Sequence, residues 1–263
     1  MRPSDQPNVH DLFEYTQDLR FGSEVQHSLF VYVLPLLLEL WADDLLGIRD
    51  DVGGVVEHLY AAFADRDLLN TALTPQQKAA VSAYMRDTIL QEIDYQSGLQ
   101  YRGKGSRPYR WIAAFSAHGV LLPDVGELWG EWWSLSTSGR AVAAVQYVSC
   151  LMYPDDENPV FAPWTPQEGG GPPCLWAYAG HLYRHCWLKD NLNFLSAFLT
   201  HASVTGILSR AAEVLHGTPE LEIAEKLVKD LPFCAGTVAA RCHELPQFLS
   251  IDQSHSGSPE WSR

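Results

Sequence analysis

The sequence lacks long apolar runs and is poor in basic residues. Its longest apolar stretch, FVYVLPLLL at residues 30–38, contains Pro35 and is followed by Glu39, so it is too short to cross a bilayer as a helix. Lys and Arg together number 18 against 32 Asp and Glu, which gives a formal net charge of −14. Because this charge repels phosphates and anionic lipid headgroups, we expect neither nucleic acid nor membranes as partners.

Cysteine is also scarce, and its positions do not form a compact framework. The odd number of cysteines and their wide spacing predict free thiols rather than a disulfide scaffold. They are Cys150, Cys174, Cys186, Cys234 and Cys242. The N-terminal region shows no basic segment followed by an apolar run and a small-residue cleavage site. These features predict a soluble protein of a reducing compartment, the cytoplasm.

Alternation of apolar and polar residues, which is typical of strands, is almost absent, whereas apolar residues recur at helical spacing along most of the chain. Thr74, Pro75 and Gln77 predict a helix start with a capping box, and Asp124 with Glu127 predicts a second one. We therefore expect an all-α fold of about eleven helices, packed as helical hairpins in a bundle or an irregular solenoid.

We expect these helices to form one domain over residues 1–250, followed by a disordered tail at 251–263. A helix over residues 23–46 should bend at Pro35 and end at Gly47. The C-terminal region predicts two separate helices, at 219–230 and 235–249. The tryptophans of ELWGEWW, namely Trp129, Trp132 and Trp133, have the spacing of one helix face, which is either buried in the core or an aromatic patch that faces a partner.

A segment rich in proline and glycine, PDDENPVFAPWTPQEGGGPPC at 154–174, interrupts this pattern. A helix cannot continue through so many prolines and three consecutive glycines. The segment also contains Val160, Phe161 and Trp164, whose size predicts an ordered loop that packs on the helices. Three roles stay open for this loop: a crossover between helical layers, a lid or partner-binding loop, or a domain linker.

Acidic residues gather in the N-terminal part of the chain, where they are nearly unopposed. The group consists of Glu39, Asp43, Asp44, Asp50, Asp51 and Glu57, with Arg49 as the one base among them. Glu39 and Asp43 are four residues apart, a spacing at which like charges slightly destabilise a helix. These acids form either a solvated face or a docking surface for a basic protein, with Trp164 as a candidate aromatic anchor.

One histidine pair has the spacing of a metal site. His181 and His185 share a helix face, and Cys174 lies seven residues before His181, so a zinc site can be drawn from these three. The pair lacks the glutamate that follows the first histidine in metalloproteases. The alternative interpretation is two imidazoles packed among aromatic side chains.

Two hypotheses about function follow from these patterns. The first is a non-catalytic, acidic protein-interaction module that binds a basic partner and needs no cofactor. Bacterial immunity proteins and antitoxin-like inhibitors share this general character, which is an analogy and transfers no residues. The second is a helical metal-dependent enzyme with zinc near His181 and His185. The sequence identifies no catalytic residues, because it has neither a nucleophile elbow nor a phosphate-binding loop.

Overall fold

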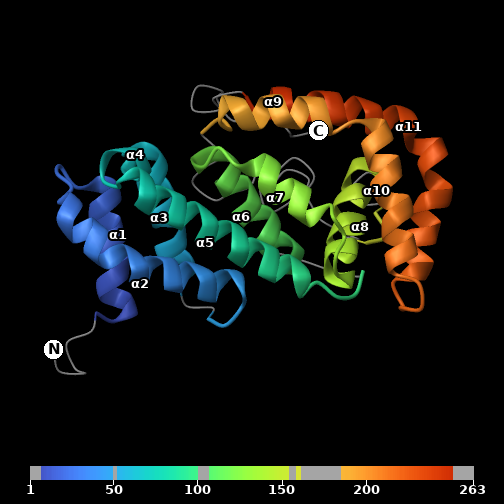
Figure 1. Ribbon diagram of the computed structural model, residues 1–263. Helices are drawn as coiled ribbons and strands as arrows, with labels where there is room; N and C mark the ends of the chain where they lie inside the picture. The colour runs from blue at the N-terminus through green and yellow to red at the C-terminus, as the bar shows by residue number, and fades with distance from the viewer. Residues whose placement is uncertain (1–6, 50–51, 100–106, 154–157, 161–184, 251–263) are drawn as a thin grey trace, which may run out of the picture. The chain divides into compact units, whose positions relative to one another are not determined.

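The computed structural model describes residues 7–49, 52–99, 107–153, 158–160 and 185–250. Within these residues the chain forms eleven helices and no strand, so the prediction of an all-α fold is confirmed (Figure 1). The contacts between helices divide the chain into two compact units, which meet in sequence between Thr88 and Ile89. We call them unit 1 and unit 2. The prediction of a single domain with a disordered tail stays a prediction.

Unit 1 is a small group of helices around an aliphatic and aromatic core. It consists of α1 (Val9–Phe21), α2 (His27–Leu45), α3 (Gly53–Asp65), α4 (Leu68–Thr71) and the first part of α5 (Pro75–Asp94). Helix α3 packs against both α1 and α2. Phe30 of α2 and Phe63 of α3 are buried and meet edge to face, with ring centroids 6.1 Å apart. This pairing of α2 with α3 leaves the opposite side of α2 open to solvent.

The end of α2 follows local chemistry. Gly47 has a positive φ of 66°, a conformation that glycine adopts without strain. The backbone N–H of Ile48 donates to the carbonyl of Asp43 at 2.8 Å, and that of Gly47 donates to Asp44 at 3.1 Å. This is a Schellman motif, and it ends the helix where the sequence predicts. The last turn contains two aspartates and no basic residue.

Unit 2 is built around a helix that other elements cover on every side. Residues 141–152 of α8 (Ser138–Met152) are all buried, and the helix packs against α10 (His201–Val214) and α11 (Leu221–Leu249). Figure 1 shows α10 and the first part of α11 running side by side as a helical hairpin. Two further helices of unit 2 are α6 (Arg107–Leu121) and α9 (Lys189–Phe198).

An aromatic cluster completes the core of unit 2. Trp129 and Trp132 of α7 (Val125–Trp132) are fully buried, and Trp133 is 5% exposed, so the interpretation of this stripe as core agrees with the structure. The rings of Trp129 and Trp132 both meet Tyr147 of α8 at 5.6 Å between centroids. Edge-to-face pairs of this kind add to the free energy gained from burial alone.

The C-terminal end of α5 and the N-terminal end of α8 come unusually close. The guanidinium of Arg140 donates to both carboxylate oxygens of Asp94, at 2.8 and 3.2 Å, and Thr137 donates to the same carboxylate at 2.6 Å. Next to this pair lies Gly139, where a Cβ atom would stand 2.1 Å from the carbonyl oxygen of Asp94. Glycine therefore permits a backbone approach that no other residue permits.

One predicted capping box is confirmed and the other is wrong. Thr74 and Gln77 exchange hydrogen bonds between side chain and backbone N–H, at 3.3 and 2.9 Å. Asp124 precedes α7 but makes no capping hydrogen bond with its side chain. Its carboxylate lies 2.7 Å from Nε2 of His118 instead, because α6 brings this imidazole to the start of α7.

Helix α11 also differs from the sequence prediction. It runs continuously over the two predicted helices, with Pro232 and Pro246 inside it. A proline removes one backbone hydrogen bond and bends a helix but need not end it, and here α10, α8 and α9 pack along both parts. No single described helix is long and apolar enough to cross a membrane. The pair α9 and α10, bent by 73°, meets that requirement only when both are taken together.

Candidate functional site: an acidic and aromatic face of unit 1

Helix α2 presents two carboxylates on the side that the core of unit 1 does not use. Its buried side contains Leu37, Leu38 and Trp41. Glu39 is exposed and Asp43 is half-buried, and their spacing of four residues places them one above the other on one helix face. The sequence therefore predicts the proximity of these two acids correctly, since it depends on helical periodicity alone.

A tyrosine from another helix joins this pair. Tyr84 of α5 is 41% exposed, and its ring packs beside the buried ring of Trp41, with centroids 6.3 Å apart. Burial raises the pKa of the Tyr84 phenol, and the negative charges of Glu39 and Asp43 raise it further. The phenol thus lies within the electrostatic field of both carboxylates. Sequence reasoning missed Tyr84, because nothing local signals that α5 packs beside the end of α2.

The two acids of this surface have no basic partner in the part of the chain that the structure describes. Within the described residues, neither Glu39 nor Asp43 forms an ion pair or a side-chain hydrogen bond. Four basic residues of unit 1 have partners outside this surface: Arg20 is paired with Asp65 at 3.9 Å, Arg86 with Asp87 at 3.7 Å, Lys78 binds the amide oxygen of Asn70, and Arg66 binds backbone carbonyls. Glu39, Asp43 and Tyr84 form what we call the acidic–aromatic face.

Two other predicted acids lie elsewhere. Asp44 is half-buried on the α3 side of α2, since its Oδ1 would be 3.9 Å from a Cβ atom built on Gly53. Burial raises the pKa of Tyr60, and the charge of Asp44 raises it further, although a hydrogen bond from Trp41 acts in the opposite direction. Glu57 is exposed on α3, and no contact joins it to the acidic–aromatic face.

The remaining predicted site residues fall largely outside the described part of the chain. This applies to Asp50, Asp51 and Trp164 of the partner-binding set, to Cys174 and His181 of the zinc set, and to most of the loop at 154–174. His185 is described and half-buried. Among the residues that the structure describes, no group of three or more metal-binding side chains comes together. The zinc site stays a prediction.

The His118–Asp124 pair of unit 2 resembles the base and its orienting acid in some hydrolases. Since a carboxylate accepts, Nε2 of His118 carries the proton, and Nδ1 would be the atom available as a base. Yet His118 is fully buried and its Nδ1 has no hydrogen-bond partner, so no serine or cysteine among the described residues reaches it. The pair instead joins the end of α6 to the start of α7.

Asn191 of α9 reinforces the same junction. Its amide donates to the carbonyls of Gly119 and Leu122 at 2.8 and 2.7 Å, and its oxygen accepts from the backbone of Val125 at 3.3 Å. The side chain thus satisfies backbone groups that the end of one helix and the start of the next leave unpaired. This arrangement has a structural role.

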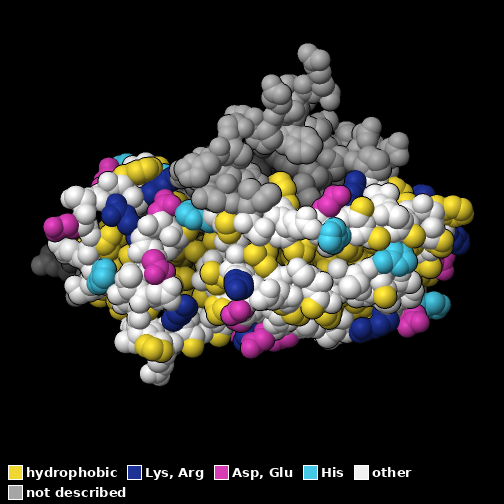
Figure 2. All heavy atoms as spheres, turned by 90° about the horizontal axis from the view of Figure 1, so that it is seen from above, with side chains coloured by type: hydrophobic (Ala, Val, Ile, Leu, Met, Phe, Trp, Pro, Cys, Tyr) yellow, Lys and Arg dark blue, Asp and Glu magenta, His cyan; other side chains and the backbone are white. Residues whose placement is uncertain are grey.

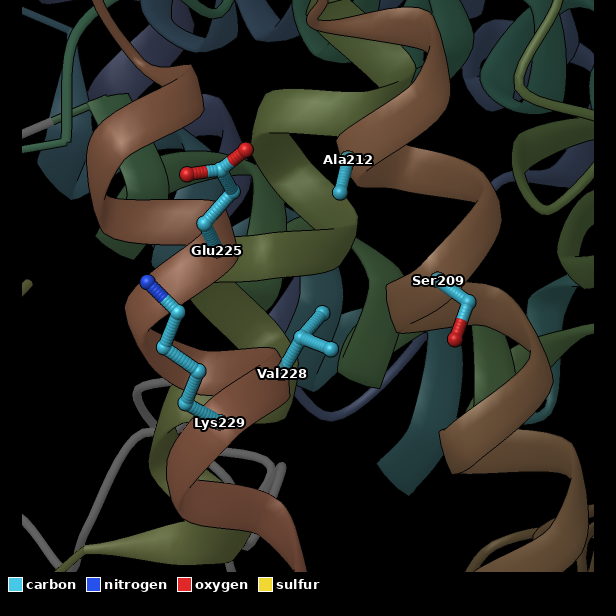
Figure 3. A pocket seen from close by; sticks show the side chains of 5 residues that line it. All are labelled: Ser209, Ala212, Glu225, Val228 and Lys229. Atoms are coloured by element: carbon cyan, nitrogen blue, oxygen red, sulfur yellow. The ribbon is translucent and has the colours of Figure 1, made fainter.

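A cavity of about 330 Å³ lies between α10 and α11 (Figure 3). Ser209, Ala212 and Val228 line it between the helices, and Glu225 and Lys229 lie one turn apart on α11. The oppositely charged pair gives the cavity no net charge. On the face of the molecule in Figure 2, acidic and basic side chains are likewise interspersed and neither type forms a patch. Neither feature competes with the acidic–aromatic face as a site for a charged partner.

No protein-family model, no curated protein and no solved structure matches this chain. The acidic–aromatic face is therefore the feature of the molecule from which a function can be proposed.

Proposed function

We propose that this protein is a non-catalytic interaction module whose acidic–aromatic face binds a basic segment of a partner protein. The observation that carries the proposal is the uncompensated pair Glu39 and Asp43 beside the exposed ring of Tyr84. An inhibitor that covers a basic partner, as immunity proteins and antitoxins do, is one kind of protein that would use such a surface.

The positions of Glu39 and Asp43 destabilise helix α2 taken by itself. Like charges four residues apart cost a few tenths of a kcal/mol, and a negative charge in the last turn of a helix opposes the helix dipole by about 0.3 to 1 kcal/mol. Asp43 lies in that last turn, where no basic residue offsets it. A bound lysine or arginine would relieve both effects and gain a cation–π contact with Tyr84.

Electrostatics also favours association at longer range. Residues 1–100 contain 16 acidic and 6 basic residues, so the N-terminal part of the chain has most of the net negative charge. A field of this sign speeds the encounter with a positively charged protein and slows it with an acidic one. The local pair would then hold the basic side chain in place once the two proteins meet.

The experiment is to purify the protein with its partner from its native source and to measure their affinity in about 50 mM and about 500 mM salt. We expect binding to weaken strongly with salt and to weaken further in the variant Glu39→Gln/Asp43→Asn. The matched control is Asp190→Asn/Glu213→Gln, which removes the same charge from exposed positions of unit 2. Affinity that is independent of salt, or lost equally in both variants, would contradict the proposal.

A further inference from the structure

The open side of α2 continues from its acids toward its N-terminus as an apolar stripe. Leu29 is 41% exposed and Tyr32 is 65% exposed. At 100° per residue, both lie within about 80° of Glu39 and Asp43 around the helix axis, with the half-buried Leu36 between them. One helix face thus presents apolar groups in its first half and carboxylates in its second.

This stripe remains exposed although α2 is rich in apolar residues. Its other side contributes Phe30, Leu34 and Leu37 to the core of unit 1. An exposed apolar surface that borders charged groups is typical of a protein-binding site. A second copy of this chain is a poor occupant, because pairing the two faces would bring four carboxylates together. The surface instead complements a partner with both apolar and basic groups.

The dimensions of the stripe define that partner further. Tyr32 precedes Glu39 by seven residues and Asp43 by eleven, so about 10 and 16 Å of helix axis separate the apolar and acidic groups. A second α-helix that lies along α2 matches these distances when its basic side chains stand two or three turns from an apolar one. A single short turn of chain could not reach both halves.

We infer that the partner's binding element is an amphipathic helix that places an apolar side chain on Leu29 and Tyr32 and its basic side chains on Glu39, Asp43 and Tyr84. This inference rests on the proposed function and adds the shape of the ligand. The apolar contact supplies affinity through burial, and the charged contacts fix the register of the two helices.

A test that needs no known partner is selection from a phage-displayed library of random peptides of about 16 residues, enough for about four helical turns. The full-length protein is the target. We expect the enriched peptides to carry Lys or Arg about seven or eleven residues from a large apolar residue. Their binding should fall by about tenfold or more both in Glu39→Gln/Asp43→Asn and in Leu29→Ser/Tyr32→Ser.

The control variant is Phe233→Ser, which removes an apolar side chain that is 90% exposed in unit 2 and should leave binding unchanged. All variants alter surface positions, and an unchanged circular dichroism spectrum verifies their fold. Peptides that need the acids but not Leu29 and Tyr32 would overturn the helix inference and leave the proposed function standing. If no peptide is enriched, or if peptide binding does not depend on Glu39 and Asp43, both the helix inference and the proposed function are overturned.

Discussion

Two helices of apolar character, α2 in unit 1 and α8 in unit 2, differ in what covers them. Every residue of α8 from 141 to 152 is buried, and the hydroxyl of Ser149 donates to the backbone carbonyl of Gln146 within the same helix. Helix α2 buries one side equally well but exposes Leu29, Tyr32 and Glu39 on the other. Complete burial is typical of a core helix, and a helix with one apolar side is typical of the surface of a globular protein. What distinguishes α2 is the exposure of Leu29 and Tyr32 next to its acids, which is why we propose it as the binding surface.

A second contrast separates two acids of unit 2 from two acids of unit 1. Asp94 and Asp230 of unit 2 are paired with Arg140 and Lys226, and Tyr153 also donates to Asp230. Glu39 and Asp43 of unit 1 have no such partner among the described residues. We propose that binding to a partner explains why two unpaired acids stand at this unfavourable position of a helix.

The largest expected effect tests the close packing of unit 2. In Gly139→Ala the new Cβ atom would clash with the backbone of Asp94, and we expect the free energy of unfolding to fall by about 3 kcal/mol. Gly130→Ala is the matched control, since a Cβ atom on this helical glycine has open space around it and should stabilise by up to about 1 kcal/mol. Urea denaturation measures the free energy of unfolding of both variants. If Gly139→Ala and Gly130→Ala changed it equally, the close contact between α5 and α8 would be contradicted.

A smaller effect concerns the paired acid of unit 2. Hydrogen bonds from Lys226 and Tyr153 lower the pKa of Asp230 below its ordinary value of 3.8. A carboxyl group whose pKa is lowered by folding stabilises the folded state at pH values above its ordinary pKa. This contribution is lost as the pH falls through the pKa of the folded state. We expect Asp230→Asn to be less stable than wild type at pH 7 by up to about 1 kcal/mol, because this pair is partly exposed.

The difference in the free energy of unfolding between wild type and Asp230→Asn should become smaller as the pH drops below 4. Denaturation at several pH values measures it. Asp43→Asn provides the comparison from unit 1, where no pair exists to be lost. If Asp43→Asn showed the same loss at pH 7 as Asp230→Asn, the contrast between paired and unpaired acids would be wrong.

The smallest effect is a shift in one titration. Because burial is the main cause of the raised pKa of Tyr84 and the two acids add to it, Glu39→Gln/Asp43→Asn should lower this pKa without restoring it to 10.0. Nuclear magnetic resonance of labelled tyrosine rings resolves the titration of Tyr84 from those of the other tyrosines. An unchanged pKa would mean that the phenol and the acids do not share one face.

Local chemistry explains what the sequence predicts well. The helix start at Thr74 and the helix end at Gly47 depend on side chains within four residues, and both are confirmed. The proximity of Glu39 and Asp43 likewise requires nothing beyond one helical turn. The spacing and size of Trp129, Trp132 and Trp133 favour a place in the core over a partner-facing patch, and their burial agrees with that interpretation.

Tertiary contacts explain what the sequence could not predict. Asp124 fails as a cap because His118 of the preceding helix takes its carboxylate. Helix α11 passes through Pro232 because other helices support both of its parts, and the four residues of α4 are too few for a periodic signal. Tyr84 could not be assigned to the site because its position depends on how α5 packs against Trp41.

The most direct test of the account is the stability of Glu39→Gln/Asp43→Asn, measured by urea denaturation at low salt. Because both carboxylates are uncompensated, we predict that their removal raises the free energy of unfolding by about 0.5 to 1 kcal/mol, and that the gain fades as salt screens the charges. Asp190→Asn is the comparison, because an acid in the first turn of α9 is favourable and its loss should destabilise slightly. A double variant less stable than wild type would mean that the two acids stabilise the fold, and it would contradict the claim that they are kept for a partner.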